Sequence, residues 1–586
     1  MEYPQLVVSA SHLCKTFSSA LANQPVHALS DLTLSIYDGQ MTALIGPDGA
    51  GKTTLIRLFC GLMAPTSGSL SVLGLDTATH AQDIQAAISY MPQRFGLYEN
   101  LSVQENLDLY ADLHGIPQDI RKKRFDELLD MTALAPFTSR LVGNLSGGMK
   151  QKLGLVCTLV RTPQLLLLDE PTAGVDPLSR RELWHILQHL VTEEHISVIV
   201  STSYMEEAAR CQQIFLLHQG RILTSGAPKD LLSCACHRCF SVKPPAAVPA
   251  RLLQSLLLKD KDKVWDAVPE GGRVRFCVRS TQSLPNLTIF QQFPNLTVAP
   301  ERERLEDSVM IQLRQADEAT GTESVPMPST TIGLDKNAPI DIEVRSLCRR
   351  FGHFTAVADT SFSVHRGEIF GLLGPNGAGK STTFRMLCGL LPASSGYLSV
   401  AGVDLRHSRS QARAKIGYVA QKFSLYATLS VQENLEFFGR AYGLRGKKLH
   451  DRISAVVDQL GLHQCVHQTA GDLPNGYKQR LSMAAALLHE PRILFLDEPT
   501  SGIDPLARRT FWQQITALAA SGTTVIITTH FMEEAEYCDH ILIQDQGRMI
   551  AFGTPEEIRR RGYGHSMNDA FIHIVEEMRR NEVTSQ

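Results

Sequence analysis

Two long stretches of this chain of 586 residues repeat each other. GPDGAGKTTLIRLFCGL begins at Gly46 and recurs as GPNGAGKSTTFRMLCGL from Gly374, an offset of 328 positions. The same offset relates LYENLSVQENL to LYATLSVQENL and LLLLDEPTAGVDP to ILFLDEPTSGIDP. A constant offset across so much sequence leaves room for few insertions, so it predicts two copies of one compact fold.

The repeat divides the chain into five parts. Residues 1–232 form a first cassette and residues 340–560 a second. Between them, residues 233–315 alternate apolar and polar positions in RVRFCVRS and SVMIQLR, which predicts short strands of a small α+β accessory domain. Residues 316–339 are rich in Thr, Ser, Pro and Gly and predict a flexible linker, and residues 561–586 a C-terminal helical tail.

Composition restricts the class of protein. The formal net charge is -3, from 57 basic and 60 acidic side chains, which gives no sign of a nucleic-acid binder. No apolar run approaches the ~20 residues that span a bilayer, and Met1 to Ala10 lacks the pattern of a secretory signal. We therefore expect a cytoplasmic location, with any membrane role peripheral.

Each copy contains the pattern GxxxxGK[ST] after an apolar run and before a helical one. Its glycines turn backbone N–H groups toward phosphates, and the helix N-terminus favours negative charge. Lys52 and Lys380 are expected to bind the β- and γ-phosphates of ATP. The predicted nucleotide-binding residues are Gly46, Pro47, Asp48, Gly49, Ala50, Gly51, Lys52, Thr53 and Thr54 in the first copy and Gly374, Pro375, Asn376, Gly377, Ala378, Gly379, Lys380, Ser381 and Thr382 in the second.

An Asp-Glu pair ends a later apolar strand in each copy. The hydroxyls of Thr53 and Ser381, together with the carboxylates of Asp169 and Asp497, are predicted to bind Mg²⁺. The next residues, Glu170 and Glu498, are predicted to polarise the water that attacks the γ-phosphorus. Alone, such a pair could equally be a strand end that reaches solvent; two copies at a fixed distance from two phosphate loops favour catalysis.

The sequence LSGGMKQKLGL, between the phosphate loop and LLLLDEP, resembles the signature of ABC ATPases, and the resemblance covers both cassettes. It implies an α/β fold in which each P-loop NTPase domain has a RecA-like core, an antiparallel β subdomain and an α-helical subdomain. It also implies roles for further residues: Gln93 and Gln421 sense Mg²⁺ and the attacking water, Asp176 and Asp504 lie at the dimer interface, Phe17 and Phe351 stack on adenine, and Ser146, Gly147 and Gly148 contact the nucleotide held by the other cassette.

In this family the two cassettes pair head to tail, here within one chain, and two departures from the pattern fall in one composite site. The second signature has Pro474 and Asn475 where the first has Ser146 and Gly147, and Pro474 offers neither a hydroxyl nor a backbone donor. The γ-phosphate-contacting His530 has Ser203 as its counterpart. The resemblance therefore implies that the site of Lys380, Glu498 and His530 turns ATP over while the site of Lys52 holds it longer, unless its retained Glu170 still supports slow hydrolysis.

Within the family, FGLYENLSVQENL, FSLYATLSVQENL and the tandem arrangement with STSYMEEA are most similar to ATPases of ABC-2-type multidrug exporters. These work with separate membrane permeases, so we expect two permease partners at the cytoplasmic face of the inner membrane. The docking residues would be Phe95, Leu97, Tyr98, Phe423, Leu425 and Tyr426; the alternative is that these side chains only fill the core.

Two other functions remain open. Soluble tandem ABC ATPases act on ribosomes, but their segment between cassettes is typically long, charged and helical, whereas here it is strand-like and then rich in Pro, Ser and Thr. A regulatory scaffold that binds ATP without turnover is disfavoured by intact Lys380, Glu498 and His530.

The run CACHRC places Cys234, Cys236, His237 and Cys239 within six residues, enough ligands for a soft metal. Its spacing is tighter than that of usual zinc sites, so a loop of unbridged thiols is the favoured interpretation.

Overall fold

A computed structural model describes residues 5–17, 25–93, 96–245, 248–281, 284–320, 338–564 and 566–584. The chain forms two compact units. The first comprises residues 1–234 with residues 304–313, and the second comprises residues 235–303 with residues 314–586. Each unit contains one copy of the sequence repeat.

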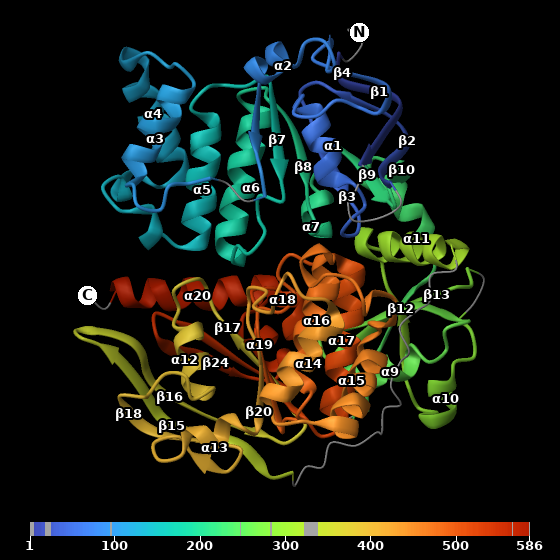
Figure 1. The fold of residues 1–586 in the computed structure, drawn as a ribbon, viewed down its shortest axis with the longest axis vertical. Coiled ribbons are helices and arrows are strands. Elements are labelled where there is room, and N and C mark those ends of the chain that lie inside the picture. Colours follow the sequence, from blue (N-terminus) through green and yellow to red (C-terminus); the bar gives the residue numbers. More distant parts are fainter. Residues whose placement is uncertain are drawn as a thin grey trace. The chain divides into compact units, whose positions relative to one another are not determined.

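The first unit contains a mainly parallel sheet of order β10-β9-β3-β8-β7-β6 and an antiparallel sheet of order β2-β1-β4-β5. Helices α3, α4 and α5 form a separate group beside the parallel sheet (Figure 1). The strands are β1 Leu6–Phe17, β2 Val26–Tyr37, β3 Met41–Ile45, β4 Ser67–Val72, β5 Leu75–Asp76, β6 Ile88–Met91, β7 Leu165–Asp169, β8 Ser197–Ser201, β9 Gln213–His218 and β10 Arg221–Gly226. The helices are α1 Lys52–Phe59, α2 Ala81–Ala87, α3 Val103–Leu113, α4 Gln118–Thr132, α5 Gly147–Leu159, α6 Pro177–Thr192, α7 Met205–Ala208 and α8 Pro228–Leu231.

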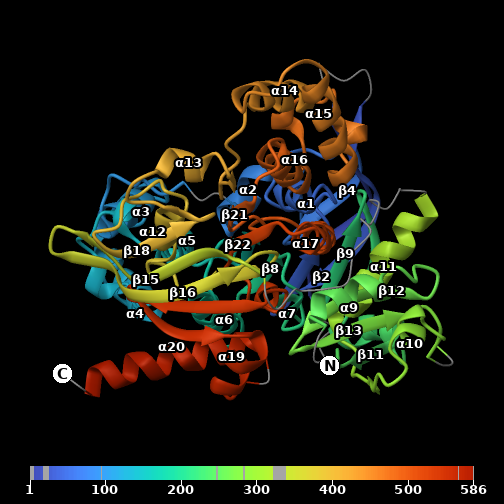
Figure 2. The same ribbon diagram turned by 90° about the horizontal axis from the view of Figure 1, so that it is seen from below.

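The second cassette repeats this architecture, and its two sheets join through β16 and β24 into the order β19-β18-β15-β16-β24-β23-β17-β22-β21-β20. Its strands are β15 Ile340–Phe351, β16 Phe354–His365, β17 Ile369–Leu373, β18 Ser395–Val400, β19 Val403–Asp404, β20 Ile416–Val419, β21 Ile493–Asp497, β22 Thr524–Thr528, β23 His540–Asp545 and β24 Arg548–Gly553. Its helices are α12 Lys380–Leu387, α13 Arg409–Arg413, α14 Val431–Ala441, α15 Gly446–Leu460, α16 Asn475–Leu487, α17 Pro505–Ala520, α18 Met532–Ala535, α19 Pro555–Arg561 and α20 Met567–Thr584. Figure 2 shows α14, α15 and α16 grouped at one end of this cassette.

Central strands are buried along their whole length because both of their faces are covered. All of β3, β7 and β8 is buried, as expected for parallel strands between two layers. The helical groups begin at defined residues: Ser102 caps α3 and Ser430 caps α14, each in a reciprocal box with the glutamate at the third helical position. The fold class implied by the resemblance is confirmed.

The accessory domain forms an antiparallel sheet of order β12-β13-β11-β14 with helices α9 and α10. Its elements are β11 Cys239–Val242, α9 Ala250–Leu257, β12 Val264–Glu270, β13 Arg273–Val278, α10 Thr288–Gln292 and β14 Val298–Pro300. The order β-α-β-β-α-β along the chain is that of ferredoxin-like folds. A core that includes Leu253, Leu257, Val274 and Phe276 joins α9 to one face of this sheet.

One expectation for the accessory segment was wrong. RVRFCV forms strand β13, but SVMIQLR lies within helix α11 (Leu305–Thr320). Leu305, Val309 and Leu313 recur at helical spacing and join the core of the first unit, so packing along one helical face overrides the local alternation. The helix also includes the first residues of the expected linker; residues 321–337 lie outside the described part of the chain.

Among the described residues, the helices include none with the length and apolarity that a membrane span requires.

Candidate nucleotide sites

Each phosphate loop connects a central strand to a helix, β3 to α1 and β17 to α12. The ammonium of Lys52 donates to the carbonyl oxygens of Gly46 at 2.7 Å and Pro47 at 3.1 Å, and Lys380 makes the same two bonds within its loop. Gly46 has φ 146°, and a Cβ there would lie 2.1 Å from the carbonyl oxygen of Leu217. Only glycine fits this position, so each loop is fixed against the neighbouring strand.

The first Asp of each pair is held by a hydroxyl on the neighbouring strand. Ser201 Oγ donates to Asp169 Oδ1 at 2.6 Å, and Thr528 Oγ1 donates to Asp497 Oδ1 at 2.6 Å. Sequence reasoning missed these two hydroxyls, although both stand at the end of a strand just before the Ser203 or His530 position. Asp169 Oδ2 is buried with no hydrogen-bond partner among the described residues, which suits a metal ligand.

The second residue of each pair points its carboxylate at the predicted sensor glutamine. Gln93 Nε2 donates to Glu170 Oε2 at 2.9 Å, and Gln421 Nε2 donates to Glu498 Oε2 at 2.6 Å. Both glutamates have left-handed backbones, with φ 49° and 45° respectively. Such conformations are unfavourable for residues other than glycine and concentrate at functional sites. The structure thus brings together the glutamine and carboxylate that the resemblance assigns to the attacking water.

The two glutamates differ in their surroundings because His530 Nδ1 lies 3.3 Å from Glu498 Oε2. Burial alone would raise the pKa of Glu498, but the nearby His530, Lys380 and Gln421 hold this pKa below its ordinary value. Burial raises the pKa of Glu170, and its neighbours do not reverse that effect. The imidazole of His530 is 1% exposed, and its Nε2 has no hydrogen-bond partner among the described residues.

The two signatures also differ. Ser146 caps α5, and its hydroxyl accepts from the N–H of Met149 at 3.3 Å. Pro474 precedes α16 without any side-chain cap, and Asn475 Nδ2 donates to the carbonyl oxygen of Gly502. Gly148 contacts α6 so closely that a Cβ would lie 2.4 Å from Ser179 Oγ. Only the first signature therefore presents a capping hydroxyl at its helix N-terminus.

Two further predicted residues cap helices. Asp176 Oδ1 accepts from Ser179 N at the start of α6, and Asp504 Oδ1 accepts from Ala507 N at the start of α17. Their carboxylates therefore fix the beginning of these helices. Their predicted role at a dimer interface stays a prediction.

The predicted adenine-stacking residues Phe17 and Phe351 lie at the ends of β1 and β15 and are exposed. A cation stands over each ring: Lys15 Nζ lies 5.3 Å from the centroid of Phe17, and the Arg349 guanidinium 4.4 Å from that of Phe351. Both rings remain accessible, and adenine stacking stays a prediction.

The residues predicted to contact a permease are not simply core residues. Tyr98 is 54% exposed and Tyr426 48% exposed, whereas Leu97, Phe423 and Leu425 are half-buried. Phe95 lies outside the described residues. In the second cassette Tyr426 packs edge-on against Phe437, which is also exposed, at a centroid distance of 4.9 Å. An aromatic surface is therefore open to a partner there.

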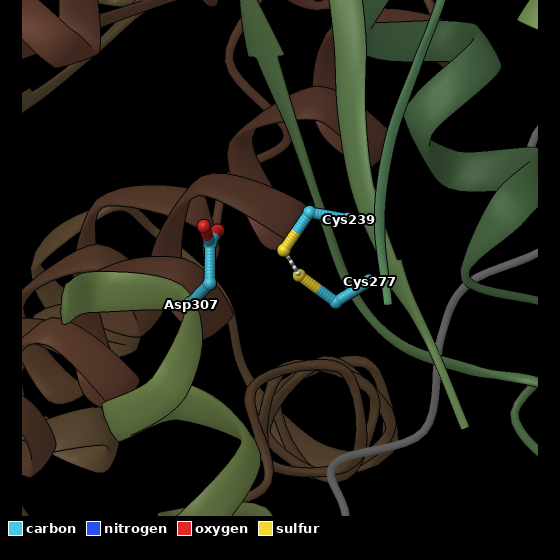
Figure 3. Close-up of side chains that lie close together, drawn as sticks. All are labelled: Cys239, Cys277 and Asp307. Carbon is cyan, nitrogen blue, oxygen red and sulfur yellow. Dashed lines mark hydrogen bonds between the residues drawn. The ribbon is translucent and has the colours of Figure 1, made fainter. Parts of the chain in front are cut away.

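The CACHRC run does not gather its own side chains into a metal site among the described residues. Cys239 instead faces Cys277 across strands β11 and β13, with 3.6 Å between the two sulfur atoms (Figure 3). Both thiols are buried. The loop interpretation was wrong for part of the run: Cys234 lies in a short 3-10 helix (Leu232–Ala235) and Cys239 in β11, while Cys234 and Cys236 are partly exposed.

Comparisons with known proteins agree with this geometry. Residues 29–173 and 357–501 each match the family model described as ABC transporter. The "Probable multidrug ABC transporter ATP-binding protein YbhF" of Escherichia coli K12 is 45% identical over 94% of this chain and 95% of its own length. The "Linearmycin resistance ATP-binding protein LnrL" of Bacillus subtilis is 40% identical over 42% of this chain and 81% of its own.

A solved structure described as the ATP-binding subunit of an ABC transporter is 30% identical and covers 40% of this chain and 99% of that one, with a TM-score of 0.37. Two matched segments in this chain, together with 45% identity over 94% of it to the Escherichia coli relative, settle the class of protein. The chain belongs to the ABC transporter family, as an ATP-binding subunit whose ATP hydrolysis is coupled to transport.

Proposed function

We propose that this chain energises an ABC-2-type export complex, with multidrug efflux as its activity, at the cytoplasmic face of the inner membrane. Two separate permeases would form the pathway. The support for multidrug export is the name of the Escherichia coli relative, which aligns along nearly the whole chain. The relatives named for linearmycin resistance and for Nod factor export also support export over import.

The single observation that carries the catalytic part is the cluster of Gln421, Glu498 and His530 in the second cassette. We assign Glu498 as the group that accepts a proton from the attacking water. The oxygen of that water bonds to the γ-phosphorus while the bond between the γ-phosphorus and the bridging β-phosphate oxygen breaks. Gln421 orients that water, and His530 Nε2 is available to a γ-phosphate oxygen. Each role needs a side chain that is held in place, and here both Gln421 and His530 lie next to the carboxylate of Glu498.

Mg²⁺, when bound, would neutralise phosphate charge as it does in other P-loop enzymes. In the first cassette Thr53 and Asp169 would hold it, and the unpartnered Asp169 Oδ2 fits that role. Ser381 and Asp497 are the corresponding residues of the second cassette. Lys52 and Lys380 bind and orient the phosphates in the two loops.

We further propose that the cassettes work unequally. The second contains the His530–Glu498 pair, while the first has Ser203, whose shorter side chain cannot reproduce an imidazole. The first cassette would then hold ATP for longer, with slow hydrolysis by Glu170. Removal of one positioned group at a phosphoryl-transfer centre can change a rate by ~10²-fold or more, which is enough for such a division of labour.

The partner surface in this proposal includes Tyr98 in the first cassette and Tyr426 with Phe437 in the second. Exposed aromatic side chains are common anchors of protein interfaces because they bury much area for little conformational entropy. A cytoplasmic helix of each permease would cover one of these surfaces.

The experiment is to purify the tagged full-length chain from detergent-solubilised membranes and to identify what co-purifies. Polytopic permeases in stoichiometric amounts support the proposal and name the subunits that select cargo. Ribosomal proteins without a permease would overturn it in favour of a translation factor.

A further inference from the structure

The accessory domain contacts the second cassette through three groups of residues, each of which reaches α17 or the segment between His530 and Asp539. Helix α9 packs against α17, the tip of the β12–β13 hairpin reaches the segment after α18, and β12 reaches α17 itself. Asp504 caps helix α17, and α18 begins at Met532, two residues after His530. The contacts thus hold α17 and the segment from His530 to Asp539, whose last residue lies beside Ile369, at the edge of the sheet opposite the phosphate loop.

The first contact is a buried ion pair. Arg251 of α9 is 2% exposed and donates to both carboxylate oxygens of Asp539, at 3.2 and 2.8 Å. Asp539 Oδ2 also accepts from the N–H of Ile369, at the start of the strand that ends in the phosphate loop. Asp539 is thereby held between the accessory domain and the strand before Gly374. A planar guanidinium that donates two hydrogen bonds to one carboxylate restricts the orientation of both groups, so this contact fixes the orientation of the Asp539 side chain as well as its distance from Arg251.

The second contact fixes the same segment closer to His530. The N–H of Gly271, at the hairpin tip, donates to Glu536 Oε2 at 2.7 Å, and Arg559 donates to the carbonyl oxygen of Gly271 at 2.7 Å. Gly271 has φ 64°, and a Cβ there would lie 1.9 Å from a nitrogen of Arg559. The hairpin tip therefore contacts both the residue after α18 and α19, and its left-handed backbone favours glycine.

The third contact reaches α17 and the same segment together. Asp266 of β12 lies 3.4 Å from Arg509 Nε, and Arg509 Nη1 donates to the hydroxyl of Tyr537 at 3.2 Å. The ring of Tyr537 stacks on Trp512 at a centroid distance of 4.6 Å. The carboxylate of Asp266 thus contacts α17 directly and, through Arg509, the segment that follows His530.

The first cassette lacks the two carboxylates that make the first and second contacts. Alignment of STSYMEEAARCQ with TTHFMEEAEYCD places Gln212 opposite Asp539 and Ala209 opposite Glu536. Gln212 Oε1 accepts from the N–H of Met41, as Asp539 does from Ile369, so the backbone hydrogen bond is kept at this position while the negative charge is absent. The carboxylates that meet the accessory domain are therefore peculiar to the cassette with the complete catalytic cluster.

We propose that the accessory domain positions His530 against Glu498, with Arg251 as its principal positioning residue. This inference rests on the proposed role of His530 in turnover. The variant Arg251→Met removes the ion pair with Asp539 and leaves the side chains that are proposed to contact nucleotide unchanged. A displacement of about 1 Å at such a centre can lower the rate of the chemical step by ~10²-fold, and we expect a loss of roughly tenfold in kcat with little change in KM for ATP.

The test is a double-mutant cycle on the full-length chain, with ATP turnover measured for Arg251→Met, His530→Ala and the pair. If Arg251 acts through His530, Arg251→Met should hardly change kcat in the His530→Ala background. Arg251→Lys should have a higher kcat than Arg251→Met. The matched control is Arg279→Met, because Arg279 stacks on Trp265 and pairs with Glu318, away from the catalytic segment. The control is expected to keep full kcat.

Equal fractional losses from Arg251→Met in both backgrounds would overturn the inference and leave the role of His530 intact. Unchanged turnover in His530→Ala would instead overturn both the proposed role of His530 and the inference that depends on it. Should Arg251→Met fail to fold, Asp539→Asn replaces it in the cycle, since the amide can still accept from Ile369 N–H as Gln212 does from Met41 in the first cassette.

Discussion

His530 Nδ1 lies 3.3 Å from Glu498 Oε2, and the first cassette cannot form this pair because Ser203 takes the position of the histidine. Otherwise the two sites correspond closely: the glutamine, the strained glutamate and the hydroxyl-held aspartate have the same arrangement in both. The proposed difference in rate between the cassettes would therefore depend on few side chains, which mutation can test.

The first prediction concerns the two glutamates. Glu498→Gln keeps the size and the hydrogen bond to Gln421 but removes the proton acceptor, so we expect ATP turnover of the full chain to fall by about 10²-fold. Glu170→Gln should lower turnover by only about twofold, because the first site contributes little to the total. Steady-state phosphate release measures both. Retained activity in Glu498→Gln together with loss in Glu170→Gln would reverse the assignment.

The second prediction concerns the phosphate loop. Gly374 has φ 152°, and a Cβ there would lie 2.1 Å from the carbonyl oxygen of Gln544, so Gly374→Ala must displace the loop from β23. We expect affinity for a fluorescent ATP analogue at the second site to fall at least about tenfold. Gly402→Ala is the control, because Gly402 also has a positive φ of 76° but no atom within 4 Å of the added Cβ. Equal loss in both variants would mean that general strain, and not loop position, weakens binding.

A third prediction follows from Glu536. Burial raises the pKa of this carboxyl to about 7, despite the N–H of Gly271 and the charge of Arg559. The unfolded chain loses this proton near pH 4.5, so between about pH 4.5 and 7 the folded chain binds more protons and its stability falls as pH rises. Glu536→Gln removes this dependence while an amide oxygen can still accept from Gly271.

The measurement is the melting temperature of both chains from pH 5 to pH 8. The variant should gain stability relative to the natural chain as pH rises, by about 2 to 3 kcal/mol over the range. A constant difference across the range would show that Glu536 has no raised pKa in the folded chain.

Features of the fold and the site could be predicted from the sequence where they depend on residues close together in the chain, and could not where they depend on residues far apart. The phosphate loops and the Asp-Glu pairs follow from local patterns that occur next to the strand ends where the site forms, whereas His530 was implied by the resemblance to ABC ATPases. Helix α11 was missed because SVMIQLR alternates locally, while its burial depends on packing against a core distant in the sequence. The Arg251–Asp539 contact joins residues 288 positions apart, and no local pattern marks either partner.

The last prediction tests the aromatic surface of the second cassette. Tyr426 and Phe437 are exposed and pack against each other, so their replacement by alanine costs the isolated chain little stability but removes an anchor for a permease helix. In membranes that contain the permeases, Tyr426→Ala with Phe437→Ala should lower the amount of chain that co-purifies with the permeases by about tenfold or more. The same variant should retain ATP turnover in detergent-free solution, because neither ring belongs to the nucleotide site. Tyr563→Ala is the matched control, since Tyr563 is 84% exposed on a different part of the second unit. Equal recovery of permeases with both variants would exclude the aromatic surface as the docking site and leave ATP hydrolysis by the second cassette untouched.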